Sequence, residues 1–436
     1  MRDLSFIGVA LLFLTAPLAA QTPLPSRVTL EEALARATAN SHRLAELRAR
    51  ELTAGAVLDQ RKASDLPIVS AQAGYLRTNH VEEFRVLQLG QVQVLYPDVP
   101  DNWRARLDMQ WPIYTGGRAQ ALEHAAAAEQ RSTGKELESA RADLRLETTR
   151  AFWALVTAID YVAVVEESVK RIDAQLSDVR ARFDAGFLPP NDVLTVESRV
   201  SQQRTLLIQA TNQRDGTRAE LARLMGVPVD ATFDVDAALV SPPPSAPAQT
   251  ETPPAVARAD REALALRVEA ADLRIEAAHS DNKPEIALVG GYDYARPNTR
   301  HFPREDTWQD SWDLGVNVTF TLWNGGRTAA QVAEARGLAE AARERLAELD
   351  SQIALEVRQR QLDLQSSRAQ VGTASAAVTS AAEARRVVAE RFTAGVATST
   401  DLLDAQVDQL QAELERTRAL ANVKLAEARL ARALGY

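Results

Sequence analysis

The side chains most often used in catalysis are few in this sequence and do not stand at catalytic spacing. There is no cysteine, and no nucleophile lies near a base and an orienting group. Each of the Gly-Gly pairs at 116–117 and 325–326 is followed by Arg, not by the Lys-Ser/Thr of a phosphate-binding loop. No two of the five histidines stand at metal-ligand spacing; they are His42, His80, His124, His279 and His301. The sequence therefore predicts no enzyme, no metal site and no cofactor.

Two aspartates occupy the same place in two similar segments. Asp192 follows a break at 184–190, and Asp401 follows a break at 393–399. An Asp just after such a break is usually an N-cap or first-turn residue that accepts hydrogen bonds from free amides. Asp404 differs from both, because Thr195 stands at its place in the first segment.

These segments belong to an internal repeat with a constant offset. Gly116-Gly117-Arg118 returns as Gly325-Gly326-Arg327, 209 positions later, and the segment from Arg182 to Gly186 returns from Arg391 to Gly395. Matching residues from Gly116 to Gly226 keep this offset, so each copy is a whole architectural unit, not a short solenoid repeat.

Four segments alternate apolar and polar residues with a period of two, which is typical of strands. They lie at about 66–77, 103–114, 284–295 and 311–323. Each has about the length of a tilted transmembrane strand. Aromatic residues lie within or beside them, as an interfacial girdle requires: Trp103, Trp111, Tyr114, Trp308, Trp312 and Trp323. The alternative is a pair of half-buried soluble hairpins.

The rest of the chain is predicted to be helical. No proline interrupts 118–182 or 327–391, and each stretch is ~100 Å long if helical throughout. Return helices follow at 191–225 and 400–434. Two further helices are expected. We expect the helix at 257–282 to continue the return helix 191–225 end to end, and the helix at 29–64 to continue the return helix 400–434.

The chain then divides into four parts. Residues 1–20 are predicted to be a signal peptide, 21–240 the first repeat, 241–254 a Pro-rich linker at an equatorial belt, and 255–436 the second repeat. The net charge of −9 argues against nucleic acid as a partner.

Four strands leave two edges unpaired, which lipid does not tolerate. Bacterial barrels begin at about eight strands. The strands therefore predict a cyclic homo-oligomer of two or more copies.

The duplicated Gly-Gly-Arg and the duplicated segments 182–194 and 391–403 make the chain resemble the TolC-type outer membrane efflux proteins. The resemblance implies a homotrimer in the lipid of the outer membrane of a Gram-negative-type bacterium. Four strands per protomer would form one twelve-stranded β-barrel, continuous with a long periplasmic α-helical barrel of coiled coils. The tips would dock on a periplasmic adaptor protein, joined to an inner-membrane pump of RND or ABC type. The chain would be the exit duct for multidrug efflux or type I secretion.

The resemblance also assigns residues. Asp401 and Asp404 match an acidic ring at the periplasmic gate, supported by Phe392 and Asp192. The strand-to-helix transitions are Gly116, Gly117, Gly325 and Gly326. The adaptor-docking tips comprise Arg182, Phe183, Gly186, Arg391, Phe392 and Gly395. Related gates are latched by a Tyr and an Arg where this chain has Phe392 and Ala397. We therefore expect a gate that is closed by packing and by acidic repulsion, with bound cations balancing the repulsion between the aspartates.

A structural function is the alternative: a coiled-coil tether or adhesin, periplasmic or on the surface, that does not conduct. Such a tether needs no lipid-facing Val316, Val318, Phe320 or Leu322, so the strands distinguish the two functions.

Overall fold

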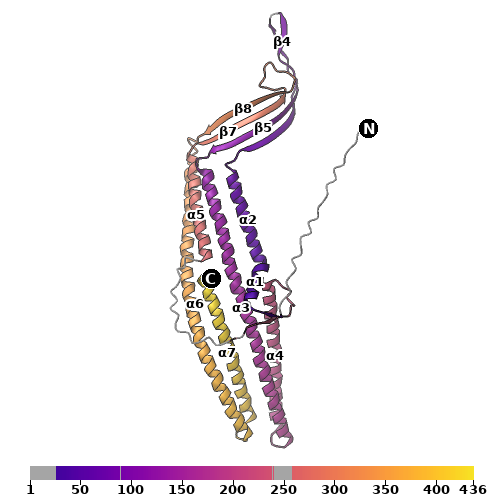
Figure 1. The fold of residues 1–436 in the computed structure, drawn as a ribbon, viewed down its shortest axis with the longest axis vertical. Coiled ribbons are helices and arrows are strands. Elements are labelled where there is room, and N and C mark those ends of the chain that lie inside the picture. The colour runs from indigo at the N-terminus through magenta and orange to yellow at the C-terminus, as the bar shows by residue number, and fades with distance from the viewer. Residues whose placement is uncertain (1–25, 89, 238, 240–257) are drawn as a thin grey trace, which may run out of the picture.

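The computed structural model describes residues 26–88, 90–237, 239 and 258–436. The predicted signal peptide and the predicted linker at 241–254 lie outside these residues. The molecule is long and narrow, with a β-sheet at one end and two helical hairpins at the other (Figure 1).

The sheet has four antiparallel strands, which the alternating segments form. In spatial order they are β2 (Ile68–Arg77), β5 (Asp101–Tyr114), β7 (Glu285–Arg296) and β8 (Gln309–Thr319). The edges are β2 and β8, and every residue of β2 is exposed. A second small sheet is a hairpin of β3 (Phe84–Gln88) and β4 (Gln91–Tyr96), which lies between the first two predicted strands, where no strand is predicted.

The strand predicted at 311–323 ends earlier in the sequence than expected. β8 stops at Thr319, which pairs with Glu285, the first residue of β7. Pro284 precedes that residue and has no amide hydrogen to donate. Residues 320–323 therefore have no ladder partner among the described residues, although their apolar alternation continues.

Two helices of 67 residues each run from the sheet to the far end. They are α3 (Arg118–Asp184) and α6 (Arg327–Thr393). Each begins after a Gly pair in the left-handed region, with φ of 90° at Gly117 and 85° at Gly326. Only glycine adopts this conformation without strain, so the pair turns the strand into the helix. None of the helices in the described part of the chain is both long and apolar enough to span a bilayer.

The chain returns through α4 (Pro190–Met225) and α7 (Ser399–Ala433), which cover the half of each long helix that lies away from the sheet (Figure 1). Shorter helices cover the other half: α1 (Leu30–Asn40), α2 (His42–Ala63) and α5 (Ala259–His279), which ends in a 3-10 turn, η2 (Ser280–Asn282). The helix expected at 29–64 is broken at Ser41, whose extended backbone ends α1 and whose hydroxyl caps α2.

The short helices continue the return helices in the opposite pairing to the one expected. Arg258, at the start of α5, donates to the carbonyl of Ala433 at the end of α7, 3.4 Å away. Asn40, at the end of α1, donates to the carbonyl of Met225 at the end of α4, 2.8 Å away. Helix α4 is therefore continued by α1 and α2, and α7 is continued by α5. Side-chain contacts at the equator decide which helix ends meet.

The buried residues form a series of small clusters along the helices. The cluster at the equator contains Phe152, Leu155, Leu221 and Met225. A short parallel pair, β1 (Arg27–Val28) with β6 (Asp234–Val235), packs its Val28 into the same cluster. The long helices are thus held by repeated side-by-side contacts, as in coiled coils.

Candidate functional site

The predicted site lies at the end of the molecule farthest from the sheet, where two hairpins turn. Gly186 turns α3 into α4 with a φ of 77°, and Gly395 turns α6 into α7 with a φ of 73°. Glycine is required at both positions, because a side chain is strained in this region of backbone space. Nothing lies within 4 Å of a Cβ built on either glycine, so both turns are open to solvent.

Arg182 makes a direct contact between the two tips. The Arg182 guanidinium lies 4.7 Å from the ring centroid of Phe392, and its Nη1 donates to the Phe392 carbonyl, 3.3 Å away. This cation–π and hydrogen-bonded contact fixes the end of α3 against the end of α6.

Phe392 itself is 6% exposed and belongs to a buried cluster. Its neighbours there include Leu176 and Val179 of α3 and Leu402 and Leu403 of α7, with Ala397 against the edge. A phenylalanine without a hydroxyl and an alanine both suit this apolar surrounding. The contact of the two tips within one chain is thus made by packing and by Arg182.

Asp401 caps the start of α7. Its carboxylate accepts from the Thr398 amide at 2.8 Å, and its own amide donates to the Thr398 hydroxyl at 3.1 Å, which completes a capping box. The hydrogen bond from the Thr398 amide lowers the pKa of Asp401, and Arg391 adds a smaller attraction. Asp192 lies in the first turn of α4, as expected, but it forms no capping box, since the start of α4 at Pro189 has no side-chain cap.

Asp401 and Asp404 line a shared groove with a volume of about 770 Å³ on the second hairpin. Asp408 extends the acidic row by one turn, which the sequence reasoning did not single out. Arg391 lies at the same groove, and its guanidinium forms no hydrogen bond or ion pair with the described residues. The groove thus holds three carboxylates and one cation.

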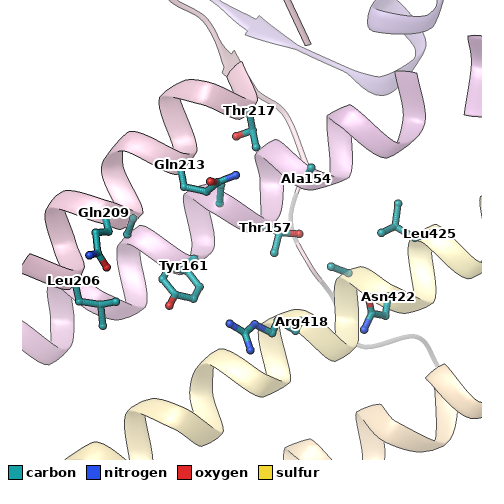
Figure 2. Close-up of a pocket in the computed structure, with 13 residues that line it drawn as sticks. Ala154, Thr157, Tyr161, Leu206, Gln209, Gln213, Thr217, Arg418, Asn422 and Leu425 are labelled. Atoms are coloured by element: carbon teal, nitrogen blue, oxygen red, sulfur yellow. The ribbon is translucent and has the colours of Figure 1, made fainter. Parts of the chain in front are cut away.

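A second cavity of about 520 Å³ lies between α3, α4 and α7, nearer the equator (Figure 2). Tyr161, Gln209, Gln213, Arg418 and Asn422 line it and come from all three helices. It has no acid–base pair that would support catalysis. Over the described residues, no cluster of three or more metal-ligating side chains is found.

A charged network covers one face of the sheet. Arg104 makes a bidentate contact with Asp293 at 2.6–3.0 Å, and Arg106 bridges Asp108, Asp293 and Asp313. The Arg106 guanidinium lies where a side chain at position 291 would stand, and Gly291 leaves it that space. The period-two alternation predicts that Arg104, Arg106 and Asp108 lie on the polar face of the sheet. It does not predict their partners on the neighbouring strands, because these depend on the register in which the strands pair.

The comparisons with known proteins agree with this architecture. A family model for outer membrane efflux proteins matches residues 33–227 and 257–436. The chain belongs to this family. It is similar to the outer membrane protein TolC of Vibrio cholerae, at 22% identity over 403 residues that cover 90% of this chain and 87% of that protein. It is also similar to the alkaline protease secretion protein AprF of Pseudomonas aeruginosa, at 24% identity over 345 residues, 76% of this chain and 69% of that protein.

Solved structures of outer membrane proteins share the fold. VceC of Vibrio cholerae superposes with a TM-score of 0.79 at 20% identity, over 93% of this chain and 96% of that one. The open MtrE channel of Neisseria gonorrhoeae superposes with a TM-score of 0.76 at 18% identity, over 93% of this chain and 88% of that one. This efflux protein is therefore located in the outer membrane and extends into the periplasm.

Proposed function

We propose that the protein is the exit duct of a tripartite export system. Three copies form one twelve-stranded barrel in the outer membrane, and the two repeats of each copy supply two strands apiece. Below the barrel, the helices form a hollow periplasmic conduit. The tips bind a periplasmic adaptor protein, which connects to an RND or ABC-type pump in the inner membrane.

The observation that carries this proposal is the incomplete sheet with one exposed apolar face. Five apolar side chains on that face are between 63% and 70% exposed: Val69, Trp312, Leu314, Val316 and Val318. The opposite face carries the network of Arg104, Arg106 and Asp293. Contact of such an apolar face with water is unfavourable in free energy, whereas contact with lipid is not.

The tips support the docking role because they are exposed and apolar at their ends. Phe187 is 79% exposed, and Val396 at the equivalent place is 68% exposed. Each follows a left-handed glycine whose surroundings are open. A partner that inserts small side chains between the hairpins would cover both.

The pump sets the kind of export, through an RND pump in multidrug efflux or an ABC pump in type I secretion. The name of AprF, alkaline protease secretion protein, refers to secretion of a protein.

Conductance of the mature protein in planar bilayers tests the proposal. Detergent-extracted protein should have the mass of three copies and give discrete current steps. A tether or adhesin would give no current. A protein that is a single chain in detergent and silent in the bilayer would contradict the exit-duct function.

A further inference from the structure

We propose that the cavity between α3, α4 and α7 binds organic anions with a flat apolar body, such as aromatic carboxylates, as they pass through the conduit. This inference rests on the proposed exit duct only for the direction in which the cavity opens, because the cavity itself lies within one chain. The protein would then bind part of its cargo midway between the tips and the sheet.

The floor of the cavity is apolar and consists of small side chains. Ala158 of α3, Ala210 of α4 and Ala421 of α7 line it and are between 5% and 7% exposed. Because no side chain projects beyond its Cβ here, the three helices enclose a space of about 520 Å³, within the usual range of small-molecule sites. A broad apolar floor of this kind suits a flat ring system.

The rim carries hydrogen-bonding groups that are free to bind a guest. Gln209 and Gln213 lie one turn apart on α4, Tyr161 belongs to α3 and Asn422 to α7, and Figure 2 shows these side chains around the space between the three helices. None of the four forms a hydrogen bond with the described residues. Amides and a hydroxyl both donate and accept, so they can orient the polar groups of a guest.

Arg418 determines the charge of the cavity. It is the only charged side chain among the described residues that line the space. It meets Glu415 at 3.9 Å, where the two side chains are 61% and 67% exposed. Such an exposed pair contributes little free energy, so the guanidinium is available to a carboxylate, which it binds through two hydrogen bonds. The cavity therefore favours an anion, although the whole chain has a net charge of −9.

The cavity opens away from the segment that follows α4, the strap, which we define as residues 233–237 and 239. On α3, Val156 packs in the cluster that contains Phe233 of the strap, whereas Ala158 lines the cavity. On α7, Ala419 packs in the cluster that Leu239 of the strap joins, whereas Ala421 lines the cavity. Residues two positions apart on a helix point in directions about 200° apart. Both helices thus turn one side to the strap and the other to the cavity.

In the proposed ring, one of these two sides is the interior of the conduit. The strap begins the connection between the two repeats, and such a connection on the inside would obstruct the passage. The strap therefore lies outside, and the cavity faces the passing molecules. Three copies present three such cavities at one level of the conduit.

A cavity of about 470 Å³ on the strap side, which Leu239 also lines, provides a contrast. Its lining carries both signs of charge, from Asp160, Glu167, Arg171, Glu413 and Arg416. Three carboxylates beside two cations do not favour an anion. Arg416 lies only two positions from Arg418 on α7, so the two arginines form a matched pair on opposite sides of one helix.

Isothermal titration with 2-naphthoate at pH 7 tests the site, using the mature protein in a non-ionic detergent. The anion should bind at one site per chain. Arg418→Gln should weaken binding by about tenfold or more, because a charge-assisted contact is lost. Tyr161→Phe should weaken it by about fivefold, the usual effect of one neutral hydrogen bond. Arg416→Gln is the matched control and should leave the affinity unchanged.

Two related compounds test the class of ligand. 2-Naphthamide has the same rings without the charge, and acetate has the charge without the rings. Each should bind about tenfold or more weakly than 2-naphthoate, because each lacks one of the two contacts. Equal binding of the amide would overturn the assignment of an anion, and equal binding of acetate would overturn the flat apolar body.

Recording in planar bilayers separates the site from the proposed function. 2-Naphthoate added on the side of the tips should interrupt the current briefly, with shorter interruptions in Arg418→Gln and unchanged ones in Arg416→Gln. A conducting channel that does not bind 2-naphthoate, or that loses binding equally in both variants, would overturn the site and leave the exit duct intact. Binding without interruptions would overturn the direction in which the cavity opens. A protein that binds the anion but carries no current would overturn the proposed function instead.

Discussion

Asp401 is first a helix cap, and this limits what it can do in a pore. Its carboxylate and amide both bond to Thr398. Thr398→Ala removes the hydroxyl acceptor and should destabilise the first turn of α7 by about 1 kcal/mol. Hydrogen exchange of the amides at 400–403 should become faster by the factor that corresponds to this loss of free energy. Thr393→Ala is the control, because the Thr393 hydroxyl donates to the carbonyl of Ala389 in its own helix and caps nothing. Equal exchange in the two variants would show that the capping box does not stabilise the tip.

Asp160 is a half-buried acid in the middle of α3, and burial raises its pKa. A carboxyl whose folded pKa lies above its unfolded pKa destabilises the folded protein when ionised, and stability falls as the pH rises through the folded value. Asp160→Asn should therefore raise the thermal midpoint at pH 7. The gain should disappear below about pH 4, where the acid is protonated in both states.

Asp178 provides the matched control for this pH dependence, since it is exposed on the same helix. Asp178→Asn should leave the midpoint unchanged at both pH values. A gain at Asp160 that persisted in acid would indicate a steric cause instead of an electrostatic one.

At the scale of the elements, Arg258 joins three helices at the equator. Its side chain is 7% exposed and pairs with Asp260 at 2.7 Å and Glu356 at 2.8 Å, besides the carbonyl of Ala433. Burial alone would lower the pKa of Arg258, but these two carboxylates raise it above its usual value. The guanidinium therefore stays charged and binds α5 to α6 and α7.

Arg258→Met should cost about 1.5–3 kcal/mol, because the partly exposed carboxylates of Asp260 and Glu356 lose the charge-assisted hydrogen bonds of the guanidinium. The measurement is the denaturant midpoint of the detergent-solubilised protein. Arg360→Met breaks a partly exposed pair with Asp363 within α6 and should cost less than about 1 kcal/mol. A similar loss in both variants would exclude a special role for Arg258 at the equator.

The sequence predicts the elements better than their meeting points. The absence of proline and the glycine turns place a helix over 118–182, and the structure has one at Arg118–Asp184. Periodicity says nothing of which helix ends meet, so the contacts of Arg258 with Ala433 and of Asn40 with Met225 could not be predicted. The stacking of Arg182 on Phe392 was missed for the same reason. The hairpin of β3 and β4 did have a signal, in Val92, Val94 and a turn at Gly90, but it is short.

At the scale of the whole molecule, the acidic groove gains its meaning from the ring. In one copy, Asp404 has no hydrogen bond or ion pair with the described residues, whereas Asp401 is held by Thr398. In the proposed trimer, three such grooves would converge on one axis at the tips. Free carboxylates brought together in this way attract divalent cations. Asp404 should therefore bind a divalent cation that blocks the channel. Asp401, which caps α7, should contribute its charge to the same site.

Single-channel recording with Mg²⁺ on the side of the tips separates these roles. Asp404→Asn should weaken the block by about tenfold or more, the factor that corresponds to about 1.4 kcal/mol of lost attraction. Glu415→Gln removes a charge from an exposed site higher on the same helix, 67% exposed, and should leave the block unchanged. Thr398→Ala should also retain most of the block, because it removes the cap but not the carboxylates. If the Asp404→Asn channel were blocked at the same Mg²⁺ concentration as the natural one, the acidic row would be a helix-capping feature and the gate would close by packing around Phe392 alone.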